Sequence, residues 1–151
     1  MMKKIYVLVS LFVLFLSITG CSQDIEKANE DYSFAAIYNG TWVDRTKIDK
    51  KGHFVKVKFE EKGSTAELTI GLKSKDNQVI EESHTTATMQ GNGDGPFTIK
   101  HPDWDKPAEG TISLREDEIV LSIKGVAEEA ESTHGLRNGT MLYEKVDYKI
   151  K

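Results

Sequence analysis

The sequence contains one cysteine, Cys21, in 151 residues, and it has no apolar run long enough to cross a bilayer as a helix. A single thiol excludes an internal disulfide framework and a metal site built from several thiolates. The longest apolar run, residues 5–16, has twelve residues, whereas a transmembrane helix needs about 20. We therefore expect non-covalent contacts alone to hold the fold together.

The sequence also lacks the motifs of common catalytic and metal sites. The four histidines, His53, His84, His101 and His134, show no H-x-x-x-H spacing. There is no G-x-S-x-G motif and no glycine loop that would hold a phosphate before a helix. The stretch GNGDG at 91–95 lacks the acidic spacing of a calcium loop and is typical of a turn. We expect a protein that is not an enzyme and that has no cofactor or metal.

The first 20 residues have the pattern of a secretory signal. Lys3 and Lys4 give it a positive start, and the twelve-residue apolar run has the length of a signal core. Residues 18–21, ITGC, then resemble the lipobox of bacterial lipoproteins. The resemblance implies that Cys21 carries a diacylglyceryl group, that cleavage occurs just before it, and that the protein is anchored on the extracytoplasmic face of the cell membrane. The alternatives are an ordinary signal peptide with a chance cysteine, or a buried free thiol.

Removing residues 1–20 leaves 131 residues, which is one domain's length. Residues 21–35 are expected to be the lipidated cysteine and a polar tether, and 36–151 the folded domain. The mature chain has 18 basic and 24 acidic residues, a net charge of −6. Such a domain has no electrostatic footprint for nucleic acid, and anionic lipid repels it weakly. Membrane attachment is therefore expected through Cys21.

The folded domain is predicted to be all-β, because apolar and polar residues alternate along most of it. In HFVKVKFE, for example, Val55, Val57 and Phe59 fall on one face and Lys56 and Lys58 on the other. Turn signals such as EKGS, SKDN and GNGDGP separate these segments. The eight predicted strands are 38–46, 53–60, 65–73, 78–90, 96–100, 110–115, 118–124 and 139–150. Residues 126–133 are either two helical turns or an acidic loop.

An open sheet of eight strands would expose its edges, so the sheet is expected to close into a barrel or to split into a sandwich. In an eight-stranded antiparallel up-and-down barrel the first and last strands are neighbours. Both of these strands begin at NGT, residues 39–41 and 138–140. The repeat indicates shared Asn-Gly turn chemistry and does not show that the strands touch. A sandwich and a smaller β-roll remain alternatives.

Gly40-x-Trp42 at the start of the first predicted strand resembles the G-x-W signature of the lipocalins and the wider calycin superfamily. With the lipobox, the chain resembles small calycin-type lipoproteins of Gram-positive bacteria. The resemblance implies an eight-stranded barrel with a cavity for a small apolar ligand. It also implies that Trp42 closes one end and that an arginine packs across it, for which Arg137 is the candidate. The position of Arg137 departs from the family pattern, as do the missing helix after the last strand and the missing second motif.

Five residues are candidates for a ligand site. The fourth strand has no wholly apolar face, which predicts a bend or bulge and either a part that faces a wet cavity or an edge-like strand with two solvated faces. Thr86 and Thr88 are its candidate lining residues. Trp104, in the loop HPDWDKP, either closes over a ligand or folds back as a cap on the core. Phe97 and Tyr143 belong to the core or to the cavity wall.

The leading functional hypothesis is a membrane-anchored lipoprotein that buries a small apolar or amphiphilic ligand in its barrel. The alternative is a β-domain with a solid core that acts as a protein-interaction module of the cell envelope. An occupied or open interior favours the first hypothesis, whereas a packed interior favours the second.

Overall fold

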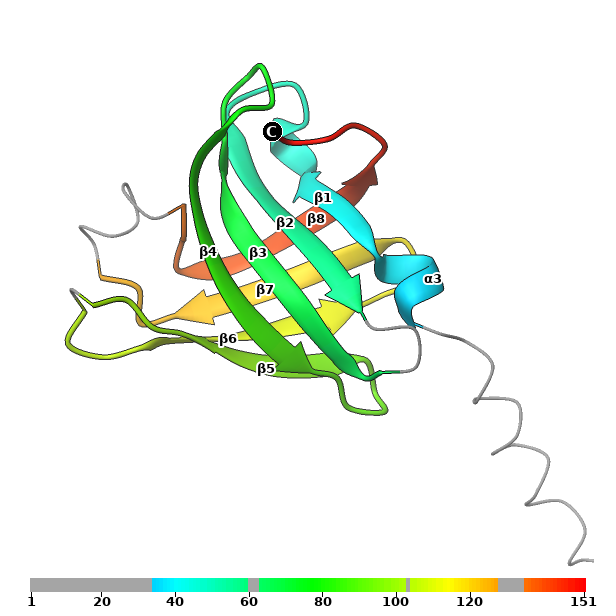
Figure 1. Cartoon of the computed structure of the whole chain (residues 1–151), viewed down its shortest axis with the longest axis vertical. Coiled ribbons are helices and arrows are strands. Elements are labelled where there is room, and N and C mark those ends of the chain that lie inside the picture. Colours follow the sequence, from blue (N-terminus) through cyan, green and yellow to red (C-terminus); the bar gives the residue numbers. More distant parts are fainter. Residues whose placement is uncertain (1–33, 60–62, 103, 128–134) are drawn as a thin grey trace, which may run out of the picture. The chain divides into compact units, whose positions relative to one another are not determined.

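The computed structural model describes residues 34–59, 63–102, 104–127 and 135–151 (Figure 1). The predicted signal, Cys21 and most of the predicted tether lie outside the described residues. Most of the acidic segment 126–133 lies outside them as well.

The described domain is an all-β sheet of eight antiparallel strands, which confirms the predicted fold class (Figure 1). The strands are β1 Gly40–Asp44, β2 Gly52–Phe59, β3 Thr65–Lys73, β4 Val79–Thr88, β5 Asp94–Ile99, β6 Ala108–Leu114, β7 Glu118–Lys124 and β8 Gly139–Val146. Their order in the sheet is β4-β3-β2-β1-β8-β7-β6-β5. The first and last strands are therefore neighbours, as an up-and-down barrel requires.

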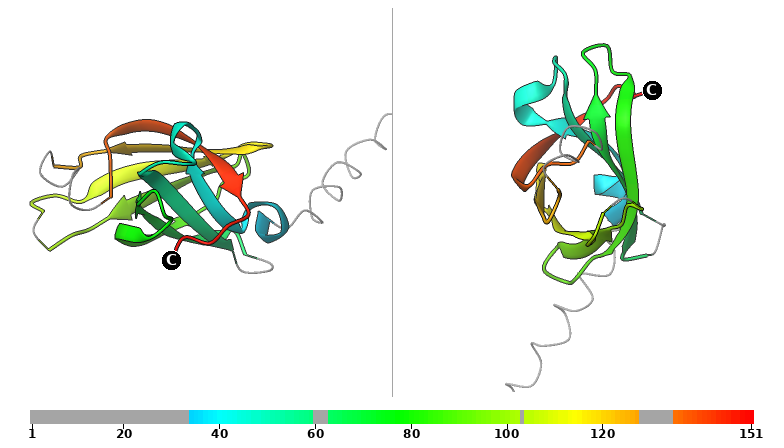
Figure 2. Two further views of the ribbon diagram at one scale, coloured as in Figure 1. Left: turned by 90° about the horizontal axis from the view of Figure 1, so that it is seen from above. Right: turned by 90° about the vertical axis from the view of Figure 1, so that its left-hand side faces the viewer.

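The sheet curls into a nearly closed barrel, and the remaining seam lies between β4 and β5 (Figure 2). These two strands are joined by a turn in which the Gln90 N–H donates to the Asp94 carbonyl at 2.7 Å. Across the seam, the Thr85 hydroxyl donates to the Thr98 carbonyl at 2.8 Å. The Thr85 side chain thus links β4 to β5, which are not paired as neighbouring strands in the sheet.

The predicted irregularity of the fourth strand is a β-bulge. Leu72 of β3 faces Glu81, while the next residue, Lys73, faces Val79. Ile80 is therefore the extra residue of β4, and its side chain is 44% exposed. A bulge of this kind increases the local bend and twist of the strand.

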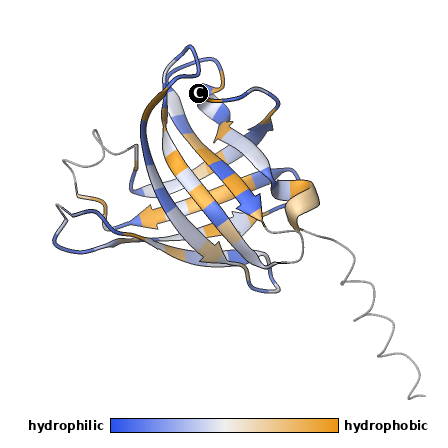
Figure 3. Ribbon diagram, in the orientation of Figure 1, coloured by the Kyte–Doolittle hydropathy of each residue, from blue (hydrophilic) through white to orange (hydrophobic). Residues whose placement is uncertain are grey.

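The main core fills the inside of the barrel, because the inward residues of most strands are apolar; on β4 only Ala87 is buried. The alternation is visible along the strands in Figure 3. On β2 and β3, for example, Val55, Val57, Leu68 and Ile70 are at most 3% exposed. Such close-packed interiors are the main favourable term in folding.

A second, smaller core lies on the outer face of the barrel, where the sequence predicts solvent. Val43, Phe54 and Ile150 are buried there, at 0%, 0% and 5% exposure. The strand predicted for residues 139–150 was too long: β8 ends at Val146, and residues 147–151 fold back over this face. The Lys151 N–H donates to the Asn77 carbonyl at 2.9 Å, which holds the returning segment in place.

The chain enters the barrel through a short helix, α3 (Phe34–Tyr38), where the sequence predicts the end of a tether and the start of a strand. Phe34 packs on Phe59 with the ring centroids 5.4 Å apart, and Tyr38 stacks on Trp42 at 6.1 Å. The first strand begins two residues later than predicted, at Gly40. The aromatic contacts explain the difference, because they hold this segment against the end of the barrel.

Candidate functional site

Gly40 and Trp42 close the α3 end of the barrel. Trp42 is 2% exposed, and its indole N–H donates to the Tyr38 carbonyl at 3.0 Å. This bond provides the one partner that a buried indole needs. Gly40 has φ +141°, and a Cβ there would lie 3.1 Å from Cε of Lys145. Glycine at this position therefore allows a backbone conformation that other residues rarely adopt. The absence of a Cβ also leaves space for the side chain of Lys145.

The cation that covers Trp42 is Lys145, so the assignment of Arg137 to this position is corrected. Lys145 lies directly opposite Trp42 in the β1–β8 register. Its ammonium lies 5.5 Å from the centroid of the Trp42 ring and donates to the Ile37 carbonyl at 2.7 Å. Arg137 is exposed and borders a shallow surface depression beside Asp44. Strand register decides the partner, because Lys145 is late in β8 whereas Arg137 precedes it.

The other end of the barrel is filled by the segment that leads into β8. Leu136 is fully buried in the main core. The Gly135 carbonyl lies 3.1 Å from Nδ1 of His53, at the start of β2. Gly135 has φ +63°, and a Cβ on it would lie only 2.7 Å from the Leu72 backbone nitrogen. Glycine therefore allows the loop to press directly onto β3.

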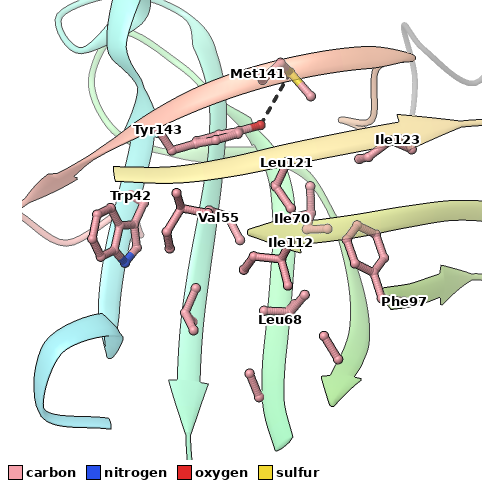
Figure 4. Close-up of a cluster of buried hydrophobic side chains, with 14 of the residues drawn as sticks. Trp42, Val55, Leu68, Ile70, Phe97, Ile112, Leu121, Ile123, Met141 and Tyr143 are labelled. Atoms are coloured by element: carbon pink, nitrogen blue, oxygen red, sulfur yellow. Dashed lines mark hydrogen bonds between the residues drawn. The ribbon is translucent and has the colours of Figure 1, made fainter. Parts of the chain in front are cut away.

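Between the two ends, large apolar side chains occupy the interior, and Figure 4 shows ten of them with labels. Phe97, one of the predicted ligand residues, is 5% exposed. Its ring covers Gly110 of β6, since a Cβ there would lie 2.2 Å from the ring. Phe97 is thus a core residue that occupies the space left by a glycine on the neighbouring strand.

Tyr143 is the polar side chain at the centre of this core. It is fully buried, and its hydroxyl donates to Sδ of Met141 at 3.4 Å (Figure 4). A thioether is a weak acceptor. Burial raises the pKa of the Tyr143 hydroxyl well above its ordinary value, and the Asp44 carboxylate raises it further. The hydroxyl is therefore neutral at any physiological pH.

We expect Tyr143→Phe to change the free energy of unfolding by less than about 1 kcal/mol, because the lost hydrogen bond is weak. Tyr38→Phe is the matched control, since the Tyr38 hydroxyl donates to the Arg115 carbonyl at 3.0 Å. The control should lose roughly 0.5–1.5 kcal/mol, the net value of an ordinary hydrogen bond. Urea unfolding of both variants measures the difference. A larger loss for Tyr143→Phe than for Tyr38→Phe would mean that the Tyr143 hydroxyl has a stronger partner.

Thr86 and Thr88 do not line a cavity, which corrects their predicted position. Both are exposed on the outer face of β4, because their neighbour Ala87 points into the core at 1% exposure. The Thr88 hydroxyl lies 3.3 Å from the hydroxyl of Thr65 on the adjacent strand. The alternation of the strand, fixed by the buried Ala87, therefore turns both threonines toward solvent.

Trp104 is partly buried and packs against the main core. Its ring centroid lies 5.5 Å from that of His101, and the backbone N–H of Trp104 donates to the His101 carbonyl at 3.1 Å. Of the two alternatives for this residue, the described contacts match the one in which it folds back onto the core.

An open groove of about 450 Å³ lies on the outer face of β5 to β8. Its central row is formed by Thr111, Ser122 and Thr140, which lie opposite one another on β6, β7 and β8. The hydroxyls of Ser122 and Thr140 are 2.9 Å apart, and Lys124 forms an ion pair with Glu109 at 3.2 Å. The groove thus has a mixed polar and apolar lining, and some of its polar side chains are paired with one another.

The described residues contain no group of three or more His, Cys, Asp and Glu side chains arranged to hold a metal ion. Within the same part of the chain, no helix has both the length and the apolar character needed to span a membrane. Comparison of the chain with protein families, with curated proteins and with solved structures finds no match.

Proposed function

We propose that the chain is a lipid-anchored protein of the cell envelope, related to the calycins, whose barrel is a solid scaffold and whose outer surface meets other envelope components. The observation that carries this proposal is the packed interior. The α3 end is closed by Trp42, the opposite end by Leu136, and both are at most 2% exposed. An eight-stranded barrel is just wide enough either to be filled by side chains or to hold one small ligand. Filling therefore favours a role for the outer surface.

The anchor in this proposal is Cys21, and it supplies the attachment that the acidic domain does not. Two acyl chains give stable membrane binding, because each buried CH₂ contributes about 0.8 kcal/mol. The lipobox-like residues 18–21 and the signal pattern of residues 1–20 support lipidation at this position. The protein would then be held at the extracytoplasmic face of the membrane.

Cys21→Ala is expected to abolish incorporation of a labelled fatty acid in a bacterial host that lipidates such proteins. The change removes the only thiol to which a diacylglyceryl group could attach. Ser22→Ala is the matched control and should label like the unchanged chain. In-gel detection of the label and the intact mass measure the result. Continued labelling of Cys21→Ala would contradict lipidation at this residue.

A second candidate function, the burial of a small amphiphilic ligand inside the barrel, is favoured by Tyr143. Its hydroxyl lies at the centre of the core and has a thioether as its partner. A ligand that displaced Met141 would offer a stronger acceptor and would gain from the apolar walls. This candidate requires the packed side chains to move apart.

Native mass spectrometry of the full chain purified from its host, with an organic extract of the same sample, separates the two candidates. A mass that corresponds to the lipidated chain alone, with no binding of added fatty acids or isoprenoids, is the result expected for a solid scaffold. A stoichiometric molecule that co-purifies with the folded chain would instead establish the ligand-binding function.

A further inference from the structure

Three segments that are far apart in the sequence meet at the end of the barrel opposite α3. They are residues 45–51, the β3–β4 turn at 74–78, and the returning segment 147–151 (Figure 1). The Tyr148 hydroxyl donates to the Ile48 carbonyl at 3.1 Å, which joins the third segment to the first. The Val79 N–H donates to the Lys151 carbonyl at 2.6 Å, which joins the third to the second. The three segments therefore form one continuous surface.

A buried lysine of β3 contacts the first of these three segments. Lys73, the last residue of β3, is fully buried, and its ammonium donates to the carbonyls of Ile48 and Lys50, both at 2.9 Å. The ammonium also lies 5.9 Å from the centroid of the Tyr148 ring. Burial lowers the pKa of Lys73, and the nearby Asp49 carboxylate opposes that shift. The carbonyl contacts fix the path of the first segment above the sheet.

This end of the barrel is strongly basic, and we call it the basic end. Its exposed lysines are Lys47, Lys50, Lys51, Lys75, Lys149 and Lys151. Its acidic side chains are Asp49, Asp76 and Asp147. With Arg45 and Lys73 included, the side chains of the basic end carry a net charge of +5, whereas the mature chain carries −6. The basic end therefore has a charge opposite in sign to that of the mature chain as a whole.

The exposed lysines of the basic end are available to a partner. Among the described residues, none of these six lysines has a carboxylate oxygen within 4.0 Å of its ammonium. Arg45, at the edge of the same region, differs in this respect, because it forms an ion pair with Glu118 at 2.6 Å. The six ammonium groups outnumber the three carboxylates of the same turns, which gives the basic end a positive local field.

We propose that the basic end is a binding surface for a linear polyanion with repeating phosphate groups. This inference rests on the proposed function in one respect: it names the outer surface that meets an envelope component. The polymer would lie across the three turns and exchange its counterions for lysine ammonium groups. Within the described domain, α3 lies at the other end of β1 from the basic end.

The composition of the surface is the reason to infer a polymer with phosphate charges. A lysine ammonium is a compact point charge on a long, flexible stem, and it can donate to a phosphate from many directions. Arginine instead favours bidentate pairs of fixed geometry. The exposed cations of the basic end beyond Arg45 are all lysines. A flexible polyanion has many charges but no single fixed geometry. Lysine side chains can bind such a polymer because their contacts do not require a fixed geometry.

The first test is the binding of long-chain inorganic polyphosphate to the full chain in non-ionic detergent, measured over a range of salt concentrations. The test variant Lys51→Gln/Lys75→Gln/Lys149→Gln removes one charge from each of the three segments. We expect it to weaken binding by roughly tenfold or more and to reduce the salt slope by about three, one for each lysine that contacts the polymer. The matched control, Lys58→Gln/Lys100→Gln/Lys106→Gln, makes the same change in net charge on other exposed lysines and should bind nearly as tightly as the unchanged chain.

Three results would overturn the inference. These are no binding of polyphosphate by the unchanged chain at low salt, equal weakening by the test and control variants, and binding only to vesicles of anionic phospholipid. Thermal unfolding shows whether each variant is folded. Lys47→Gln/Lys50→Gln is a second test variant, for use if the first does not fold. A negative result would not contradict the proposed solid scaffold or the proposed lipid anchor. Those two proposals are tested independently, by native mass spectrometry and by fatty-acid labelling.

Discussion

Trp42→Ala is expected to lower the free energy of unfolding by about 3–5 kcal/mol, the usual cost of removing a large buried aromatic side chain. Trp42 is 2% exposed and closes the α3 end of the main core. Its removal would also leave the Tyr38 carbonyl without the indole donor and the Lys145 ammonium without the ring beneath it. Urea unfolding, monitored by circular dichroism, measures the loss.

Two further variants separate the contributions at this end of the barrel. Trp42→Phe keeps an aromatic ring and should cost less than Trp42→Ala. Lys145→Met keeps the apolar stem and removes the ammonium that lies over the ring and bonds to the Ile37 carbonyl. Because Lys145 is exposed, its variant should have a much smaller effect than Trp42→Ala. A loss below about 1 kcal/mol for Trp42→Ala would show that the tryptophan does not close the core, and it would remove the main support for a relationship to the calycins.

Phe54→Ala should have an effect of the same size, about 3–5 kcal/mol, although Phe54 faces outward from the barrel. Its side chain is fully buried beneath the segment 147–151, next to Val43 and Ile150. The ring also has the Lys56 ammonium 5.3 Å from its centroid. Removing the ring would leave a cavity between the sheet and the returning segment. The same urea unfolding measurement determines the loss.

Lys58 provides the matched control for Phe54, since it points to the same outer face of β2 and is exposed. Lys58→Ala should therefore leave stability nearly unchanged. Ile150→Ala should cost about 2–5 kcal/mol, and the double variant with Phe54→Ala should cost less than the sum of the two, because neighbours in one cluster are not additive. Strict additivity would mean that Ile150 and Phe54 do not support each other.

Much of the fold could be predicted because alternation along a strand is a local property of the backbone. Val55, Val57 and Phe59 fall on one face in the sequence, and all three point into the barrel at no more than 4% exposure. The number of strands follows from the same pattern, whereas the need to protect sheet edges allowed either a barrel or a sandwich, and the structure pairs the first strand with the last. The bulge of the fourth strand was also predictable, from its lack of an apolar face.

The candidate site was less predictable, because its partners are set by register between distant segments. Arg137 and Lys145 are both cations near the last strand, and the pattern of residues does not say which one faces Trp42. The register places Lys145 directly opposite Trp42. Thr86 and Thr88 illustrate the same limit. The fourth strand has mixed polarity on both faces, so its inward face is decided by the contacts of Ala87 with the core.

The sequence by itself determined the all-β class, because alternation and turn chemistry are local; the barrel and the closing role of Trp42 were expectations drawn from the G-x-W resemblance. The tertiary structure alone decided the burial of Phe54 and the assembly of the basic end. Phe54 lies on the polar side of its strand, and the segment that covers it comes from residues 147–151. The Tyr148 hydroxyl and the Ile48 carbonyl are 100 residues apart in the sequence and 3.1 Å apart in space. No local pattern encodes such a contact, since it forms only when the sheet has closed and brought both segments to the same end.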